Sequence, residues 1–167
     1  MFLKVIKKGI HVLANISYLL ILLYALVCVP IIFDYKPLVV LSGSMTPTYK
    51  VGSVIYYTPV SESEIKEGDV VTFSYEEDTY VTHRIISIEN GEYETRGDAN
   101  NTSDARHIKY ENIHGKVAKK SIPYIGHYIY FVNQHLYLLI IIVIILISEF
   151  LLNNVKAFDI DNKRERK

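Results

Sequence analysis

The sequence contains little cysteine, little glycine or proline, and no excess of either charge. Its one cysteine, Cys28, excludes an intrachain disulfide framework and a cysteine-rich zinc site. The 8 glycines and 5 prolines among 167 residues are too few for a fibrous or disordered chain. The 18 Lys and Arg residues balance 18 Asp and Glu residues. This balance argues against a nucleic-acid-binding protein, because such a protein would carry a basic excess.

Charged residues are also missing from a long stretch near the N-terminus. No Asp, Glu, Lys or Arg occurs from residue 9 to 33. Residues 10–33 would form a helix of roughly 36 Å, against a membrane hydrocarbon core of about 30 Å. A domain of ~100 residues is too small to surround such a helix. A cleavable signal peptide would have a shorter apolar region, of about 7–15 residues, and a small-x-small cleavage site. The sequence therefore favours an uncleaved membrane anchor at 10–33.

A second stretch, residues 136–152, is almost free of charge. As a helix it would be about 26 Å long, at the short end of what a membrane span needs. Glu149 lies near its end, where an acid costs less than the roughly 2.5–3.5 kcal/mol of the membrane centre. The many Leu, Ile and Val residues outweigh that cost. The pattern predicts a second span, and the alternative is a hydrophobic helix lying against the domain.

Basic residues precede the first apolar stretch and follow the second. Lys4, Lys7 and Lys8 precede the first, and Lys156, Lys163, Arg164, Arg166 and Lys167 follow the second. By the positive-inside tendency, both ends face the cytoplasm. The predicted organisation is a cytoplasmic N-terminus (1–9), an anchor (10–33), an extracytoplasmic domain (34–135), a second span (136–152) and a cytoplasmic basic tail (153–167).

The middle of the chain has the pattern of a β-domain. Short runs rich in β-branched and aromatic residues occur at 51–57, 70–75, 80–88, 92–96 and 113–118. Turn signals separate them, including the segment 76–78 and Asn90-Gly91, which is a strong hairpin signal. Residues 122–134 are rich in aromatics, which suit a membrane interface beside a span. We expect a compact, mostly antiparallel β-domain.

Three short segments contain the residue types that catalysis uses. Ser44 lies in the segment 41–47, whose Gly and Pro favour a turn that can expose a hydroxyl and aim backbone N–H groups at one point. His83 lies in a predicted strand, and histidine is the side chain best suited to accept a proton near neutral pH. Asp98 and Asp104 share one loop, where they could hold a cation or orient a histidine. Each segment alone also has an ordinary structural interpretation.

Taken together and in this order, the segments resemble a known family. The matching motifs lie at 42–47 (Ser-Gly-Ser-Met-x-Pro), 68–73 (Gly-Asp-Val-Val-x-Phe), 82–85 (Thr-His-Arg-Ile), 97–104 (Gly-Asp-x-Asn with a later Asp) and 122–126 (Ile-Pro-Tyr-Ile-Gly). They make residues 10–135 similar to type I signal peptidases of the endoplasmic-reticulum, archaeal and Gram-positive subgroup, peptidase family S26B. The implied fold is mainly β: a small antiparallel β-domain (signal peptidase/LexA-like) flanked by N- and C-terminal transmembrane helices.

The resemblance also implies catalytic roles. Ser44 would be the nucleophile, and His83 the general base in place of the lysine of the bacterial subgroup. Asp104 is the residue we expect to orient His83, with Asp98 as the competing assignment. In this chemistry the histidine removes the serine proton and the acid stabilises the imidazolium that forms. The implied activity is that of a serine endopeptidase, signal peptidase I, which uses no metal or cofactor.

Substrate and location follow from the same resemblance. Ser42 would support the oxyanion, and Met45 would contribute to substrate binding. The implied partners are signal peptides of secretory precursors, with small residues at −1 and −3, and the lipid bilayer; association with the translocon is a further expectation, and nucleic acid is not among the partners. The implied location is the cell membrane, as a multi-pass protein whose catalytic domain is extracytoplasmic.

Two other functions stay open at this point. In a catalytically silent, membrane-anchored β-domain that acts as a subunit or binding module, every site residue would have a structural role only. A serine protease with a Ser–Lys dyad would use Lys66, Lys109 or Lys116 as its base. Unchanged function in Ser44→Ala would support the silent module, and retained activity in His83→Ala would support the dyad.

Overall fold

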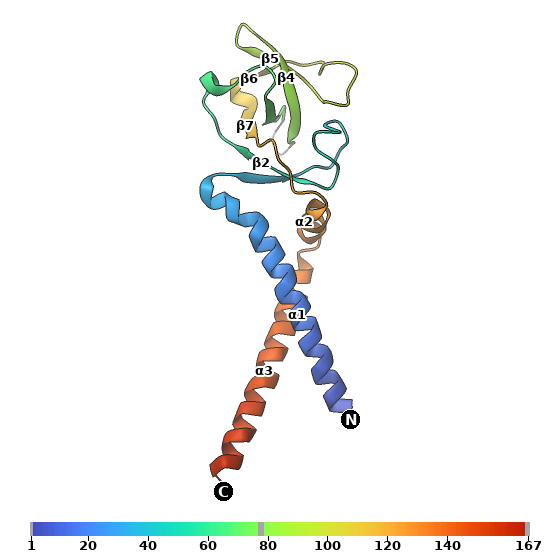
Figure 1. The fold of residues 1–167 in the computed structure, drawn as a ribbon, viewed down its shortest axis with the longest axis vertical. Helices are drawn as coiled ribbons and strands as arrows, with labels where there is room; N and C mark the ends of the chain where they lie inside the picture. Colours follow the sequence, from blue (N-terminus) through green and yellow to red (C-terminus); the bar gives the residue numbers. More distant parts are fainter. Residues whose placement is uncertain (1, 77–78, 166–167) are drawn as a thin grey trace. The chain divides into compact units, whose positions relative to one another are not determined.

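The computed structural model describes residues 2–76 and 79–165, which fall into two compact units (Figure 1). One unit comprises the chain up to Leu26 together with the chain from Val132 onward. The other comprises Val27–Phe131 and contains every strand of the described residues.

The strands of the second unit form one seven-stranded sheet within the described part of the chain. They are β1 (Lys36–Val39), β2 (Val54–Thr58), β3 (Val70–Phe73), β4 (Val81–Glu89), β5 (Glu92–Arg96), β6 (Ile108–Lys109) and β7 (Ile113–Val117). Their order across the sheet is β1-β2-β7-β3-β4-β5-β6, and neighbouring strands are antiparallel throughout. The prediction of a mainly β, antiparallel domain is confirmed.

Each predicted run overlaps one of these strands, with ends that are the same or differ by up to three residues. The hairpin predicted at Asn90-Gly91 is confirmed: it joins β4 to β5, and both residues have positive φ, 52° and 80°. The short strand β6 was not predicted, since its two residues have no alternation to detect. The turn predicted at 76–78 lies mostly outside the described residues.

Two apolar clusters make up the core of this unit. One consists of Met45, Tyr49, Ile55, Tyr57, Val70 and Val117. The other consists of Ile65, Val71, Phe73, Ile85, Tyr93 and Ile108. Val70 and Val71 are neighbours on β3 but belong to different clusters, because successive side chains of a strand point to opposite faces. The sheet is therefore buried on both faces along β3, which fixes the strands that flank it.

Short helices connect or follow the strands: η1 (Val29–Phe33), η2 (Glu62–Glu64), η3 (Tyr110–Asn112) and α2 (Ile125–Gln134). The sequence pattern predicted only an aromatic interface segment where α2 lies, because ten residues give little helical periodicity. Gly126 of α2 donates its N–H to the Gly52 carbonyl at 3.0 Å. A Cβ on Gly126 would lie 2.7 Å from that carbonyl oxygen, so the close approach requires glycine.

The first unit contains the long helices α1 (Phe2–Cys28) and α3 (Tyr137–Glu165). The stretches Lys4–Phe33 and Tyr137–Asn154 are long and apolar enough to cross a membrane, by length and composition. They overlap the segments 10–33 and 136–152, for which the sequence predicts membrane spans. The helix α3 runs through most of the predicted tail, 153–167. The basic side chains of that tail lie outside the described residues.

Candidate active site

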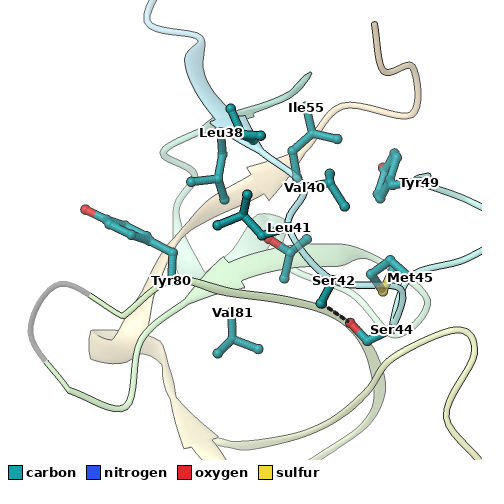
Figure 2. Close-up of a pocket in the computed structure, with 12 residues that line it drawn as sticks. Leu38, Val40, Leu41, Ser42, Ser44, Met45, Tyr49, Ile55, Tyr80 and Val81 are labelled. Carbon is teal, nitrogen blue, oxygen red and sulfur yellow. Dashed lines mark hydrogen bonds between the residues drawn. The ribbon is translucent and has the colours of Figure 1, made fainter. Parts of the chain in front are cut away.

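A cleft of about 360 Å³ lies between the segment at the end of β1 and the start of β4 (Figure 2). Residues 38–42 and 80–82 line it, and Met45, Tyr49 and Ile55 complete a mostly apolar lining. Figure 2 shows Ser42 and Ser44 together at one end of the cleft, far from Tyr80. The cleft is therefore a largely apolar trough with two serine hydroxyls at one end.

Ser44 is held in a tight turn. The N–H of Thr46 donates to the carbonyl of Gly43 at 3.0 Å, and Met45 anchors the turn in the core with only 2% of its surface exposed. Ser44 itself is half-buried, and it lines the cleft. Its hydroxyl oxygen lies 3.3 Å from that of Ser42. The turn thus presents the Ser44 hydroxyl to anything that occupies the cleft.

His83 lies on β4 with its ring fixed from one side. Its Nδ1 lies 2.7 Å from Oδ2 of Asp104, and the hydroxyl of Thr95 donates to the same oxygen at 2.6 Å. The N–H of Asp104 in turn donates to the Thr95 carbonyl at 2.8 Å. Because a carboxylate only accepts hydrogen bonds, Nδ1 is the donor, and Nε2 of the neutral ring is an acceptor. The arrangement leaves Nε2 free to take a proton.

Gly97 is where His83 and the Ser44 segment meet. Arg96 of β5 pairs with Arg84 of β4, so Gly97 lies opposite His83. A Cβ on Gly97 would lie 2.6 Å from the carbonyl oxygen of Ser44 and 3.0 Å from Nε2 of His83. Both groups therefore border the small space that the missing side chain leaves. Glycine is required here because any side chain would displace one of them.

Asp98, the competing acid, has different partners. Its oxygens accept hydrogen bonds from Nε of Arg84 at 2.8 Å and from Nη2 at 2.7 Å, and also from the hydroxyl of Thr48. The Arg84 guanidinium, helped by the Thr48 hydroxyl, lowers the pKa of Asp98 despite its partial burial. Arg84 also donates to the Gly68 carbonyl at 2.7 Å. Asp98 thus ties the loop 97–104 to β4 and to the turn that carries Ser44.

The predicted site residues lie in the cleft, on β4 and in the loop 97–104. Ser42, Ser44 and Met45 line the cleft, and Asp104 contacts His83, whereas Asp98 pairs with Arg84. Sequence reasoning missed Thr95. The sequence pattern does not reveal it, because only the register shift between Ile85 and Ser87 brings Thr95 opposite Ile85, on the same face of the sheet as His83.

Two of the alternatives from the sequence concern Lys116 and the two acids of the loop 97–104. Lys116 pairs with Asp69, with 2.7 Å between Nζ and Oδ1. Asp98 and Asp104 are engaged by separate partners, as above. Among residues 2–76 and 79–165, no group of three or more His, Cys, Asp or Glu side chains is arranged to hold a metal ion.

Comparison with known proteins finds similarity to signal peptidases. A family model described as "Signal peptidase, peptidase S26" matches residues 13–98. Signal peptidase I W of Bacillus subtilis is 35% identical over 99 residues, which are 56% of this chain and 52% of that protein. The human signal peptidase complex catalytic subunit SEC11C is 30% identical over 110 residues, 58% of this chain and 57% of that protein. A sec11 catalytic subunit of Dictyostelium discoideum is 34% identical over 101 residues, 53% of this chain and 55% of that protein. The matched region thus spans little more than half the length of these relatives.

Proposed function

Because the chain belongs to the peptidase S26 family of signal peptidases, a family of serine peptidases, we propose that it is a membrane-bound serine endopeptidase that removes N-terminal signal peptides from translocated precursors. The observation that carries the proposal is the position of the His83 ring: Asp104 holds its Nδ1, and its Nε2 borders the space at Gly97 that the Ser44 carbonyl also borders. A nucleophile, a base and an acid that orients the base are the parts that hydrolysis by a serine peptidase needs.

In the proposed mechanism, Oγ of Ser44 attacks the scissile carbonyl carbon while Nε2 of His83 takes the hydroxyl proton. The negative charge of Asp104 stabilises the imidazolium. The Ser42 hydroxyl and backbone N–H groups of the turn stabilise the oxyanion of the tetrahedral intermediate. Its collapse breaks the peptide bond: His83 gives the proton to the departing amine, which is the new N-terminus of the mature protein.

The second half of the cycle removes the signal peptide from the enzyme. After the first half, the signal peptide is bound to Ser44 as an ester. His83 then deprotonates a water molecule, which attacks the ester carbonyl. The ester bond breaks, Ser44 recovers its proton from His83, and the signal peptide leaves with a free carboxyl group. No redox step or additional reactant enters the cycle.

The cleft supports a particular kind of substrate. An extended peptide could lie along residues 38–42 or 80–82 and add to the sheet as a strand. Met45 and Tyr49 are buried and line the cleft that contains Ser44. We expect the substrate residues at −1 and −3 to be small, as they are in the substrates that the family resemblance implies. The names of the SEC11 relatives, each a catalytic subunit of a signal peptidase complex, make partner subunits a further part of the proposal.

The location follows from the two candidate spans. We place both termini in the cytoplasm and the β-domain outside it, because basic residues adjoin the outer ends of the spans. A precursor held by its signal helix in the same membrane would then meet the site at a high effective concentration.

The test is cleavage of a purified precursor by the full-length chain in detergent micelles, with the products identified by mass spectrometry. We expect one cut, after a small-x-small sequence, and none with Ser44→Ala at an unchanged unfolding temperature. If the wild type alone leaves the precursor uncut, membrane extract is added to the wild type and to Ser44→Ala, and cleavage above the Ser44→Ala level shows that a partner subunit is needed. A precursor that stays uncut alone and is cut no better than with Ser44→Ala in the extract, or equal cleavage by Ser44→Ala without extract, would contradict the proposal.

A further inference from the structure

Glu149 is an acid within the apolar part of α3, and both of its partners lie on α1. Its Oε1 is 3.0 Å from Nδ1 of His11, and its Oε2 accepts a hydrogen bond from the hydroxyl of Tyr18 at 3.1 Å. The three residues belong to the same compact unit. An ionisable side chain in a membrane-spanning segment is costly unless it is paired, so contacts of this kind mark a specific site.

The contact continues along one face of α1. Between His11 and Tyr18, Ala14 and Ser17 are 0% and 4% exposed, although most of α1 is exposed. Small residues at such positions let two helices approach closely. Further along, the hydroxyl of Tyr24 donates to Oδ1 of Asn133 at 3.2 Å.

The helix α3 presents a matching face. Its half-buried residues are Leu138, Ile142, Ile145, Leu146, Ser148, Glu149 and Leu152, at the three- and four-residue spacing of one helix face. The early part of α1 contacts the late part of α3, whereas Tyr24 contacts a residue that precedes α3. The two helices therefore run antiparallel where they cross (Figure 1).

We propose that the partner of α3 is α1 of the same chain, and that the His11–Glu149–Tyr18 cluster locks the two spans into one antiparallel pair. The cluster gives the acid of the second span a defined partner, and the small residues beside it allow close packing. The proposal rests on the membrane anchoring that the proposed function includes, but not on the peptidase activity.

Cross-linking of the full-length chain in membranes tests which face of α3 meets α1. In a Cys28→Ser background, Ala14→Cys is combined with Ile145→Cys on the half-buried face or with Ile147→Cys on the exposed face. We expect an intramolecular disulfide, detected by peptide mass spectrometry, with Ile145→Cys and little with Ile147→Cys. Equal yields at the two positions, or disulfides formed only between two molecules, would overturn the proposal.

Removing Glu149, and then exchanging the residues at positions 11 and 149, tests the cluster itself. In the Ala14→Cys, Ile145→Cys chain, Glu149→Ala should lower the yield by about three- to tenfold, the size of effect expected from interhelical hydrogen bonds. Combining His11→Glu with Glu149→His should restore the yield. The control is Ser148→Ala, since the Ser148 hydroxyl bonds the Ile144 carbonyl of its own helix at 2.7 Å. A Glu149→Ala yield equal to that of this control would contradict the lock.

The outcome does not depend on catalysis. Cross-linking is read without a substrate, so an inactive chain that shows the expected pattern would refute the proposed peptidase and leave the helix pair standing. Resistance of the chain to alkaline extraction from membranes reports the anchoring separately. An active peptidase without the face-specific cross-link would refute only the pair.

Discussion

Replacing Asp104 by asparagine removes the carboxylate that contacts His83, which we propose as the general base. The imidazolium and the carboxylate lie roughly 4 Å apart between charge centres, and at an effective dielectric constant of about 20 their attraction is about 4 kcal/mol. In the proposed mechanism the imidazolium forms when His83 takes the serine proton, so this attraction stabilises the transition state and not the bound substrate. At 1.36 kcal/mol for each tenfold change, kcat should fall by about a thousandfold with little change in KM.

The matched variant is Asp98→Asn, which removes an acid from the same loop. Asp98 bonds Arg84 and Thr48, so its loss should lower the free energy of unfolding by about 1–3 kcal/mol and leave kcat within about tenfold of the wild type. Initial rates of precursor cleavage are compared at a temperature where both variants are folded by circular dichroism. If Asp98→Asn lowered kcat more than Asp104→Asn did, the assignment of Asp104 would be refuted.

Further variants probe the supports of the site. Gly97→Ala puts a methyl group about 3.0 Å from Nε2 of His83, so the folded variant should lose most of its cleavage rate; a rate like the wild type's would count against the geometry. Thr95→Val removes a donor to Asp104 and should lower kcat by about tenfold at constant KM, with recovery in Thr95→Ser; a change in stability alone would make Thr95 merely structural. Because Arg84 lowers the pKa of Asp98 in the fold, the ionised acid stabilises the chain above its unfolded pKa of about 3.9. The excess stability of the wild type over Asp98→Asn in denaturant titrations should therefore persist at neutral pH and shrink as the pH falls below that value; an excess that grew on acidification would contradict this.

Much of the fold could be predicted because the local signals agree with the sheet. The runs at 70–75 and 92–96 contain strands close to their predicted limits, and Asn90-Gly91 supplies the positive φ that a tight hairpin needs. The helix α2 could not be predicted, since its ten residues are stabilised by contacts such as the Gly126–Gly52 hydrogen bond. Such tertiary contacts leave no periodic pattern in a short segment.

Part of the candidate site could be predicted from short motifs. Ser44 and His83 follow from motifs that keep their order along the chain. Sequence could not choose between Asp98 and Asp104, because both lie in an irregular loop whose path is set by bonds to other strands. Thr95, on β5, captures Asp104 beside His83, and that contact exists only once the strands have paired.

The central claim is that Ser44 and His83 act as one unit in peptide-bond cleavage. The most direct measurement is the single-turnover rate of precursor cleavage for Ser44→Ala, His83→Ala and the double variant, each verified as folded. Residues that act together show non-additive losses, so each single variant should fall to the same residual rate and the double variant should be no slower. Losses that multiply in the double variant, or substantial cleavage by His83→Ala, would contradict the account.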